Sequence, residues 1–238
     1  MAKKNTAASG SKLMEKPDTM TADISNDSEI VQRLQRNRNI LLGVVIALVV
    51  LVAGWFGYNY YKQTKNQEAQ TYMFPAVYHF EADSLNKALK GDGINDGLET
   101  IADEYGMTDA GNLAQFYAGV AYLKQGKFDN AINYLKDFKS SDLLVQARAY
   151  ALVGDAYMEK NQLGEAITYY EKAANYKPNS FFTPQYLMQL ALAQELNKNT
   201  SAAIDTYNKI INEYPNAAEI TNAKKYKSKL EGLAGTGK

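Results

Sequence analysis

The hydrophobic pattern of the chain is dominated by one uninterrupted apolar run, residues 40–57, which reads ILLGVVIALVVLVAGWFG. None of these residues carries a charged or strongly polar side chain. At about 1.5 Å per residue, an α-helix of this length just crosses the hydrocarbon core of a bilayer. The pattern therefore predicts a single transmembrane helix, which separates a short N-terminal tail from a larger C-terminal domain.

The charges that flank the run predict the orientation of this helix. Three arginines precede it closely, whereas only Lys62 and Lys65 follow it within the next twenty residues. Basic residues beside a first span stay on the cytoplasmic side of the membrane. We therefore expect residues 1–32 to be a disordered cytoplasmic tail and residues 33–61 to be the anchor helix with its basic flank. The rest of the chain would then lie in the periplasm of a bacterium, outside its inner membrane.

A cleaved signal peptide and a buried core helix are the alternatives to a transmembrane helix. The region before the run is about forty residues long and the run itself exceeds a usual signal-peptide core of about 7–15 residues. Large aromatic residues follow in place of a small-x-small cleavage site, among them Trp55 and Tyr58. Aromatic rings suit the boundary between lipid headgroups and water. These features favour a retained anchor.

A fixed pattern of small and aromatic residues repeats over residues 112–217. The central copy carries, in order, Gly154, Tyr157, Ala166, Tyr170, Ala173 and Pro178. Small residues allow two antiparallel helices to approach closely, aromatic residues fill the space between them, and proline ends a helix because it lacks an N–H group. The pattern predicts three helical hairpins of similar sequence.

The other two copies depart from the central one in specific ways. Gly119 lies 35 residues before Gly154, whereas Ala191 lies 37 residues after it. We expect the two extra residues in the connection 179–184. Residues 62–111 are expected to hold a linker helix and a degenerate first repeat, and residues 218–238 a capping helix and a flexible C-terminus.

This spacing closely resembles the tetratricopeptide repeat family. The predicted fold is all-α, with one N-terminal transmembrane helix followed by a tetratricopeptide helical-hairpin solenoid and a C-terminal capping helix. The whole layout also resembles the YfgM-like ancillary SecYEG translocon subunit family, and residues 96–131 are similar to membrane-anchored repeat proteins of the Bacteroidetes. That resemblance implies a periplasmic domain that associates with SecYEG and passes secretory chains to periplasmic chaperones.

Composition argues against several classes of function. The formal net charge is zero, from 26 basic and 26 acidic residues, so nucleic-acid binding is disfavoured. The chain has no cysteine, and its one histidine, His79, is expected to be a packing residue. The Gly91–Gly97 segment hints at calcium, but Ile94 interrupts the ligand spacing and a plain loop is expected. We therefore predict no catalytic residues, no metal, no cofactor and no small-molecule substrate.

The first helix of each repeat is expected to line a groove that binds other proteins. The residues assigned to that groove are Phe116, Val120, Leu123, Arg148, Asp155, Met158, Met188 and Leu192. Flexible methionine side chains suit adaptable contacts with a bound segment. The alternative is that many of these side chains pack against neighbouring helices. The Lys and Asn residues with which some repeat proteins grip a carboxylate tail are missing from these positions.

The leading hypothesis is a membrane-anchored periplasmic scaffold for protein–protein interaction, ancillary to the Sec translocon and to chaperone handover. An envelope scaffold for cell division or wall assembly would have the same fold and topology. An organelle import receptor would instead expose the repeat domain to the cytosol. The identity of the bound proteins separates the first two hypotheses, and the topology separates the third.

Overall fold

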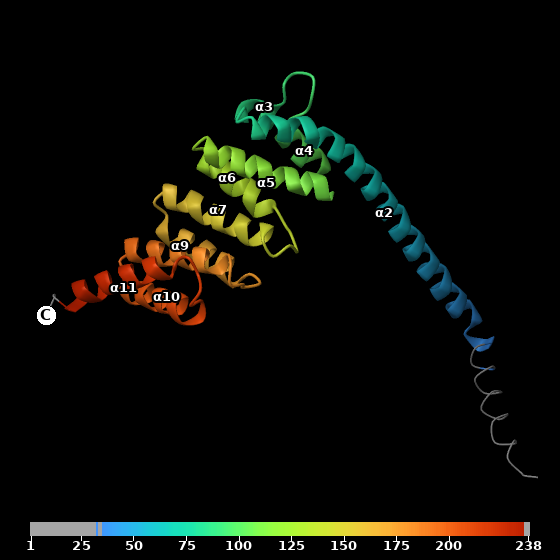
Figure 1. The fold of residues 1–238 in the computed structure, drawn as a ribbon. Helices are drawn as coiled ribbons and strands as arrows, with labels where there is room; N and C mark the ends of the chain where they lie inside the picture. The colour runs from blue at the N-terminus through green and yellow to red at the C-terminus, as the bar shows by residue number, and fades with distance from the viewer. Residues whose placement is uncertain (1–31, 33–34, 236–238) are drawn as a thin grey trace, which may run out of the picture. The chain divides into compact units, whose positions relative to one another are not determined.

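The computed structural model describes residue 32 and residues 35–235, and every regular element within them is a helix (Figure 1). The expected disordered tail lies outside the described residues except for Gln32, and so does the end of the expected flexible C-terminus. The described residues divide into two units, one up to Tyr58 and one from Asn59 onward. The repeat domain is contained in the second unit.

Helix α2 (Arg38–Glu81) contains the whole apolar run and is 44 residues long. It is long and apolar enough to cross a membrane, and none of its most apolar stretch is buried in the protein. Beyond the run, the helix continues through Pro75 and buries the side chains of Ala69, Met73 and Ala76. The apolar segment and the first core-forming segment of the repeat domain are therefore parts of one helix.

Two short helices follow α2 in the segment where we expect the degenerate first repeat. They are α3 (Leu85–Lys90) and α4 (Leu98–Tyr105), and the loop between them is held by Asp92. The Asp92 carboxylate accepts hydrogen bonds from the backbone N–H groups of Ile94 and Asn95 and lies 3.2 Å from His79 Nε2. His79, which was expected to be a packing residue, is thus also a polar contact of this loop.

Three helical hairpins and a final helix complete the domain, and each helix packs against the next (Figure 1). The helices are α5 (Asp109–Lys124), α6 (Phe128–Asp137), α7 (Val145–Glu159), α8 (Leu163–Asn175), α9 (Thr183–Leu196), α10 (Thr200–Glu213) and α11 (Ile220–Gly235). Helix α11 contributes Ala223 and Leu230 to the core of the last hairpins. This arrangement confirms the predicted solenoid of helical hairpins with a C-terminal cap.

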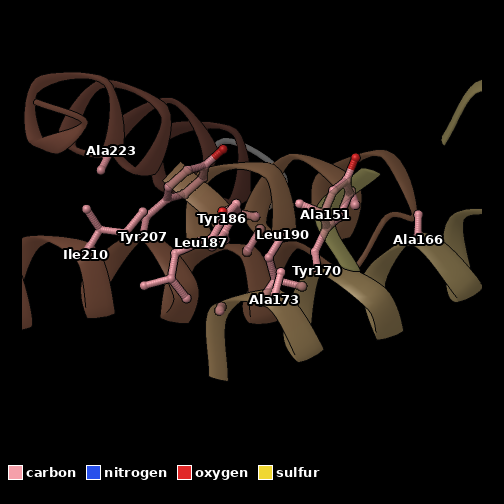
Figure 2. Close-up of a cluster of buried hydrophobic side chains, with 14 of the residues drawn as sticks. Ala151, Ala166, Tyr170, Ala173, Tyr186, Leu187, Leu190, Tyr207, Ile210 and Ala223 are labelled. Atoms are coloured by element: carbon pink, nitrogen blue, oxygen red, sulfur yellow. The ribbon is translucent and has the colours of Figure 1, made fainter. Parts of the chain in front are cut away.

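The close approach of the two helices in each hairpin explains the repeated small residue. A Cβ atom on Gly154 would lie 2.6 Å from Cε1 of Tyr170, and one on Gly119 would lie 2.5 Å from Cγ of Leu135. The third hairpin has Ala191 and Tyr207 at the matching positions, and both are buried. Figure 2 shows the rings of Tyr170 and Tyr207 among the buried alanine and leucine side chains of this core.

The turn inside each hairpin holds one residue in the left-handed conformation. These residues are Gly126, Asn161 and Lys198, with φ angles of 71°, 55° and 61°. In each turn the next amide donates to a carbonyl near the end of the first helix, as Gln162 N does to Tyr157 O at 2.9 Å. Such bonds satisfy carbonyl groups that a helix end would otherwise leave without a donor.

The extra residues of the longer repeat do not lie where we expected them. The connections 138–144 and 176–182 have the same length, so the 179–184 segment is not an insertion. Helix α8 has 13 residues, whereas its counterpart α6 has 10. The prediction was wrong because an insertion that follows a helical pattern extends the helix, where each added residue gains a hydrogen bond.

Candidate protein-binding groove

Three adjoining pockets lie along helices α5, α7 and α9, the first helices of the three hairpins. The largest, about 580 Å³, is named here the acidic pocket and lies at the C-terminal ends of these helices. Its lining comprises Leu123, Lys124, Gly126, Phe128, Asp155, Met158, Glu159, Tyr170, Gln189 and Leu192. The lining combines two carboxylates, Asp155 and Glu159, with apolar side chains.

The other two pockets, of about 440 and 350 Å³, share Phe116, Val145 and Arg148 and are named together the arginine groove. Their further lining residues are Phe80, Leu113, Tyr117, Val120, Leu144, Leu152, Phe182, Gln185 and Tyr186. Arg148 is the only charged side chain among these lining residues. The arginine groove is thus an apolar, aromatic surface with one cation in it.

The structure brings most of the predicted groove residues onto these surfaces. Phe116, Val120, Leu123, Arg148, Asp155, Met158 and Leu192 each line at least one of the three pockets. Met188 lines none of them and is a partly buried side chain that packs against the core of the last hairpins. The groove assignment of Met188 therefore has no support in the pocket geometry.

Sequence reasoning missed two residues that shape the acidic pocket. The Tyr170 hydroxyl donates a hydrogen bond to Asp155 Oδ1 at 2.8 Å, although Tyr170 belongs to the second helix of its hairpin. Gln189 Nε2 donates to the same oxygen at 2.9 Å from helix α9. The repeat spacing assigns Tyr170 to the core. Nothing in that spacing indicates that the hydroxyl of this tyrosine extends into the groove.

Burial and neighbouring groups act in opposite directions on Asp155. Its partial burial raises the pKa of the carboxyl, and the negative charge of Glu159 adds to this increase. The hydrogen bond from Tyr170 and the positive charge of Arg148 lower the pKa. The net pKa lies above its usual range. Burial also raises the pKa of Tyr170, as does the nearby Asp155 carboxylate. The Tyr170 hydroxyl therefore stays protonated and serves Asp155 as a donor.

The lysine beside the acidic pocket is engaged elsewhere. Lys124 Nζ lies 2.9 Å from Asp83 Oδ1 and 5.3 Å from the centre of the Phe80 ring. Neither Arg148 nor Glu159 forms a salt bridge with any residue that the structure describes. The free charges of the two surfaces are therefore a cation in the arginine groove and carboxylates in the acidic pocket.

The two surfaces combine apolar side chains with a few charged and polar groups. Within residues 35–235, no group of three or more His, Asp or Glu side chains is placed to hold a metal ion. In the acidic pocket, the Asp155 carboxylate accepts hydrogen bonds from Tyr170 and Gln189, and no histidine lies among the lining residues. What the surfaces offer to another molecule is apolar area, a cation and hydrogen-bond acceptors.

Family models place this architecture among known repeats. A tetratricopeptide repeat-like domain matches residues 33–142, and two tetratricopeptide repeat models match residues 147–180 and 185–217. The class defined by fold and groove is therefore a tetratricopeptide-type scaffold for protein–protein interaction, attached to a helix long and apolar enough to span a membrane. Within that class, the matches identify the repeats and no narrower family. No curated protein matches the chain.

Proposed function

We propose that this protein is a single-span scaffold of the bacterial inner membrane whose repeat domain binds other proteins in the periplasm. The observation that carries this proposal is the continuity of α2, which contains the apolar run and then packs into the repeat domain. The family match supports it, because the matched residues 33–142 include the apolar run as well as the first repeats. The apolar run and the first repeats thus lie within one matched region.

The orientation follows from charge. Arg36 and Arg38 lie just before the apolar run, and basic residues of this kind stay in the cytoplasm. Trp55, Phe56 and Tyr60 lie at the other end of the run, and their exposed rings suit the outer headgroup region. The repeat domain follows that end and would therefore be periplasmic.

We infer further that the partners belong to the secretion machinery, namely SecYEG, periplasmic chaperones or secretory chains that emerge from the translocon. The support for this step is the resemblance in layout together with the nature of the groove. An apolar and aromatic surface with isolated charges suits segments that are not yet folded, because such segments expose large apolar side chains.

Topology can be tested because the chain has no cysteine. Ile94, which is 92% exposed, would be replaced by cysteine in one variant and Ser28 in another. In intact spheroplasts, a membrane-impermeant maleimide should label the Ile94→Cys variant and leave the Ser28→Cys variant unlabelled until the cells are lysed. The reverse pattern would contradict the periplasmic assignment and favour a domain that faces the cytosol.

Partners can be identified by photo-crosslinking in cells from Met158 and Leu192, both in the acidic pocket. Glu171, an exposed residue of helix α8, serves as the control position outside the groove. Translocon subunits, chaperones or secretory chains captured from the two groove positions and not from Glu171 would support the proposal. Division or wall-synthesis proteins would instead support the envelope-scaffold alternative, and identical products from all three positions would contradict the groove assignment.

A further inference from the structure

Helix α7 carries charges of opposite sign along one face. Arg148 and Asp155 are seven residues apart, so their side chains lie on the same side of the helix and about 10.5 Å apart along its axis. Glu159 lies one turn beyond Asp155 on the same face. The face therefore has a cation near the N-terminal end of α7 and two carboxylates near its C-terminal end.

These charges are available to a partner. Arg148 and Glu159 are exposed and have no salt bridge with any side chain in the described part of the chain. Both hydrogen bonds that Asp155 receives go to the same oxygen, Oδ1. Lys124, the one cationic residue in the lining of the acidic pocket, forms a salt bridge with Asp83. Arg148 and Glu159 on this face are thus free to pair with charges of a bound partner.

The surroundings of each charge indicate which side chains would bind it. Arg148 lies between Phe116, Phe182 and Tyr186, with no other charged residue in the arginine groove. In such apolar surroundings, an acidic side chain of a partner gains more from Arg148 than it would in water. Bulky apolar residues next to that acidic side chain would fill the two pockets on either side.

The acidic pocket has the complementary character. Leu123, Met158 and Leu192 form apolar walls next to the Asp155 and Glu159 carboxylates, which suits the long aliphatic stem and the charged head of lysine or arginine. Gln189 Oε1 is buried without any donor among the described residues, although the amide nitrogen of the same side chain is used. An unpaired buried acceptor is costly, and a donor of a bound cation can satisfy it.

We propose that this face of α7 binds a protein segment that carries one acidic and one basic side chain about 10 Å apart, with bulky apolar residues beside them. The acidic side chain pairs with Arg148, and the basic side chain enters the acidic pocket. In a polyproline II segment, which has three residues per turn, side chains three residues apart lie on the same side at about this distance, and in an α-helix side chains seven residues apart do. The inference rests on the proposed protein-binding role of the groove and specifies what that groove recognises.

The test uses the full chain in lipid nanodiscs and three fluorescent synthetic peptides with the same Leu- and Phe-rich background. The peptides carry Asp and Arg, Asp and Asp, or Arg and Arg at positions three apart, and a second set uses a spacing of seven. Binding is measured by fluorescence anisotropy. The wild-type protein should bind the Asp–Arg peptide of one set about tenfold more tightly than either like-charged peptide, which corresponds to about 1.4 kcal/mol.

Charge reversal on the protein makes the test specific. Arg148→Glu should shift the preference to the Arg–Arg peptide, and Glu159→Lys should shift it to the Asp–Asp peptide. Lys136→Glu, on the exposed surface of helix α6, matches the charge change of Arg148→Glu outside the groove and should change nothing. Circular dichroism of each variant checks that the helices are intact.

The outcomes distinguish this inference from the broader proposal. Equal affinity for all three peptides, with groove crosslinks still formed in cells, would overturn charge pairing and leave the proposed function in place. Absence of binding by every peptide would also overturn the charge-paired segment as the occupant. If groove-specific crosslinks in cells are absent as well, the proposed function is overturned together with the charge-paired segment. Preferences that reverse with the variants as stated would support the inference.

Discussion

The contact between Gly154 and Tyr170 allows the packing of the repeat to be tested at one atom. In Gly154→Ala, the added methyl group would lie 2.6 and 2.7 Å from two carbons of the Tyr170 ring and 3.1 Å from a third. Carbon atoms in contact lie about 3.5–4.0 Å apart. Tyr170 is 3% exposed, and a shift of its ring would break the hydrogen bond from its hydroxyl to Asp155. Accommodating the methyl group therefore requires the two helices of the hairpin to separate.

Two effects of opposite sign set the size of the change. Overpacking of a well-packed core costs about 1–3 kcal/mol, and replacing glycine by alanine within a helix gains about 1 kcal/mol. We expect Gly154→Ala to lower the free energy of unfolding by up to about 2 kcal/mol. Gly164→Ala is the matched control because that glycine has no atom within 4 Å of a built Cβ. It should be neutral or stabilising by up to about 1 kcal/mol.

The assay is urea unfolding of the full chain in nanodiscs, followed by circular dichroism. A double-mutant cycle with Tyr170→Ala isolates the contact, since the methyl group on residue 154 should cease to be destabilising once the ring is gone. If Gly154→Ala is as stable as Gly164→Ala, or if its cost persists in the Tyr170→Ala background, the close approach of these helices is not as described. The larger substitution Gly154→Leu should be worse than Gly154→Ala in every case.

Three further predictions concern single residues. Burial raises the pKa of Asp155 above its usual 3.8, so the folded state favours the protonated carboxyl. The contribution of Asp155 to the free energy of unfolding is therefore fully present at low pH and is lost as pH rises through the raised pKa. Asp155→Asn should therefore flatten the pH dependence of the urea midpoint in that window. Thr108 caps helix α5 by accepting from Gly111 N at 3.0 Å, so Thr108→Ala should cost about 1–2 kcal/mol in urea unfolding while Thr108→Ser costs less. Lys198 has a left-handed φ of 61°, a conformation that glycine adopts without steric cost. Lys198→Gly should therefore raise the free energy of unfolding by about 0.5–1 kcal/mol, which a higher thermal midpoint would show.

The features that follow from periodicity could be predicted from the sequence. The apolar run required nothing but length and composition, and it lies in one helix as predicted. The spacing of Gly119, Gly154 and Ala191 identified the hairpins because small residues recur wherever two helices approach each other closely. The helix faces directed away from those contacts were then fixed by counting, which is why most of the expected groove residues do line the pockets.

Features that depend on a single side chain or turn could not be predicted in this way. Asn161 and Lys198 occupy the left-handed turn position that Gly126 fills in the first hairpin, so residue type alone gave no common signal. Met188 lies on the expected helix, where it is partly buried against the core and lines none of the three pockets. Gln189, its neighbour in sequence, instead donates across to Asp155. Which of two adjacent residues faces the groove depends on the local rotation of α9, which no periodic pattern specifies to within one residue.

Tyr170 links the packing of the central hairpin to the chemistry of its groove. Its ring fills the space against Gly154, and its hydroxyl donates to Asp155 Oδ1 at 2.8 Å. Tyr170→Phe should keep the packing and remove the hydrogen bond, which costs about 1.5–3 kcal/mol when the acceptor is charged. The cost should shrink as pH falls and Asp155 becomes protonated. Urea unfolding at several pH values measures both effects.

The third hairpin provides the control for that prediction. Tyr207 occupies the position of Tyr170 and is also buried, but Leu192 stands where the central hairpin has Asp155. Tyr207→Phe removes the same hydroxyl without a carboxylate acceptor at the matching position, so it should be much less destabilising and its effect should not vary with pH between 4 and 7. Equal costs for the two variants would mean that the hydroxyl of Tyr170 does not stabilise the Asp155 carboxylate. A pH-dependent cost confined to Tyr170→Phe would show that the tyrosine that packs against Gly154 also stabilises the Asp155 carboxylate of the groove through its hydroxyl.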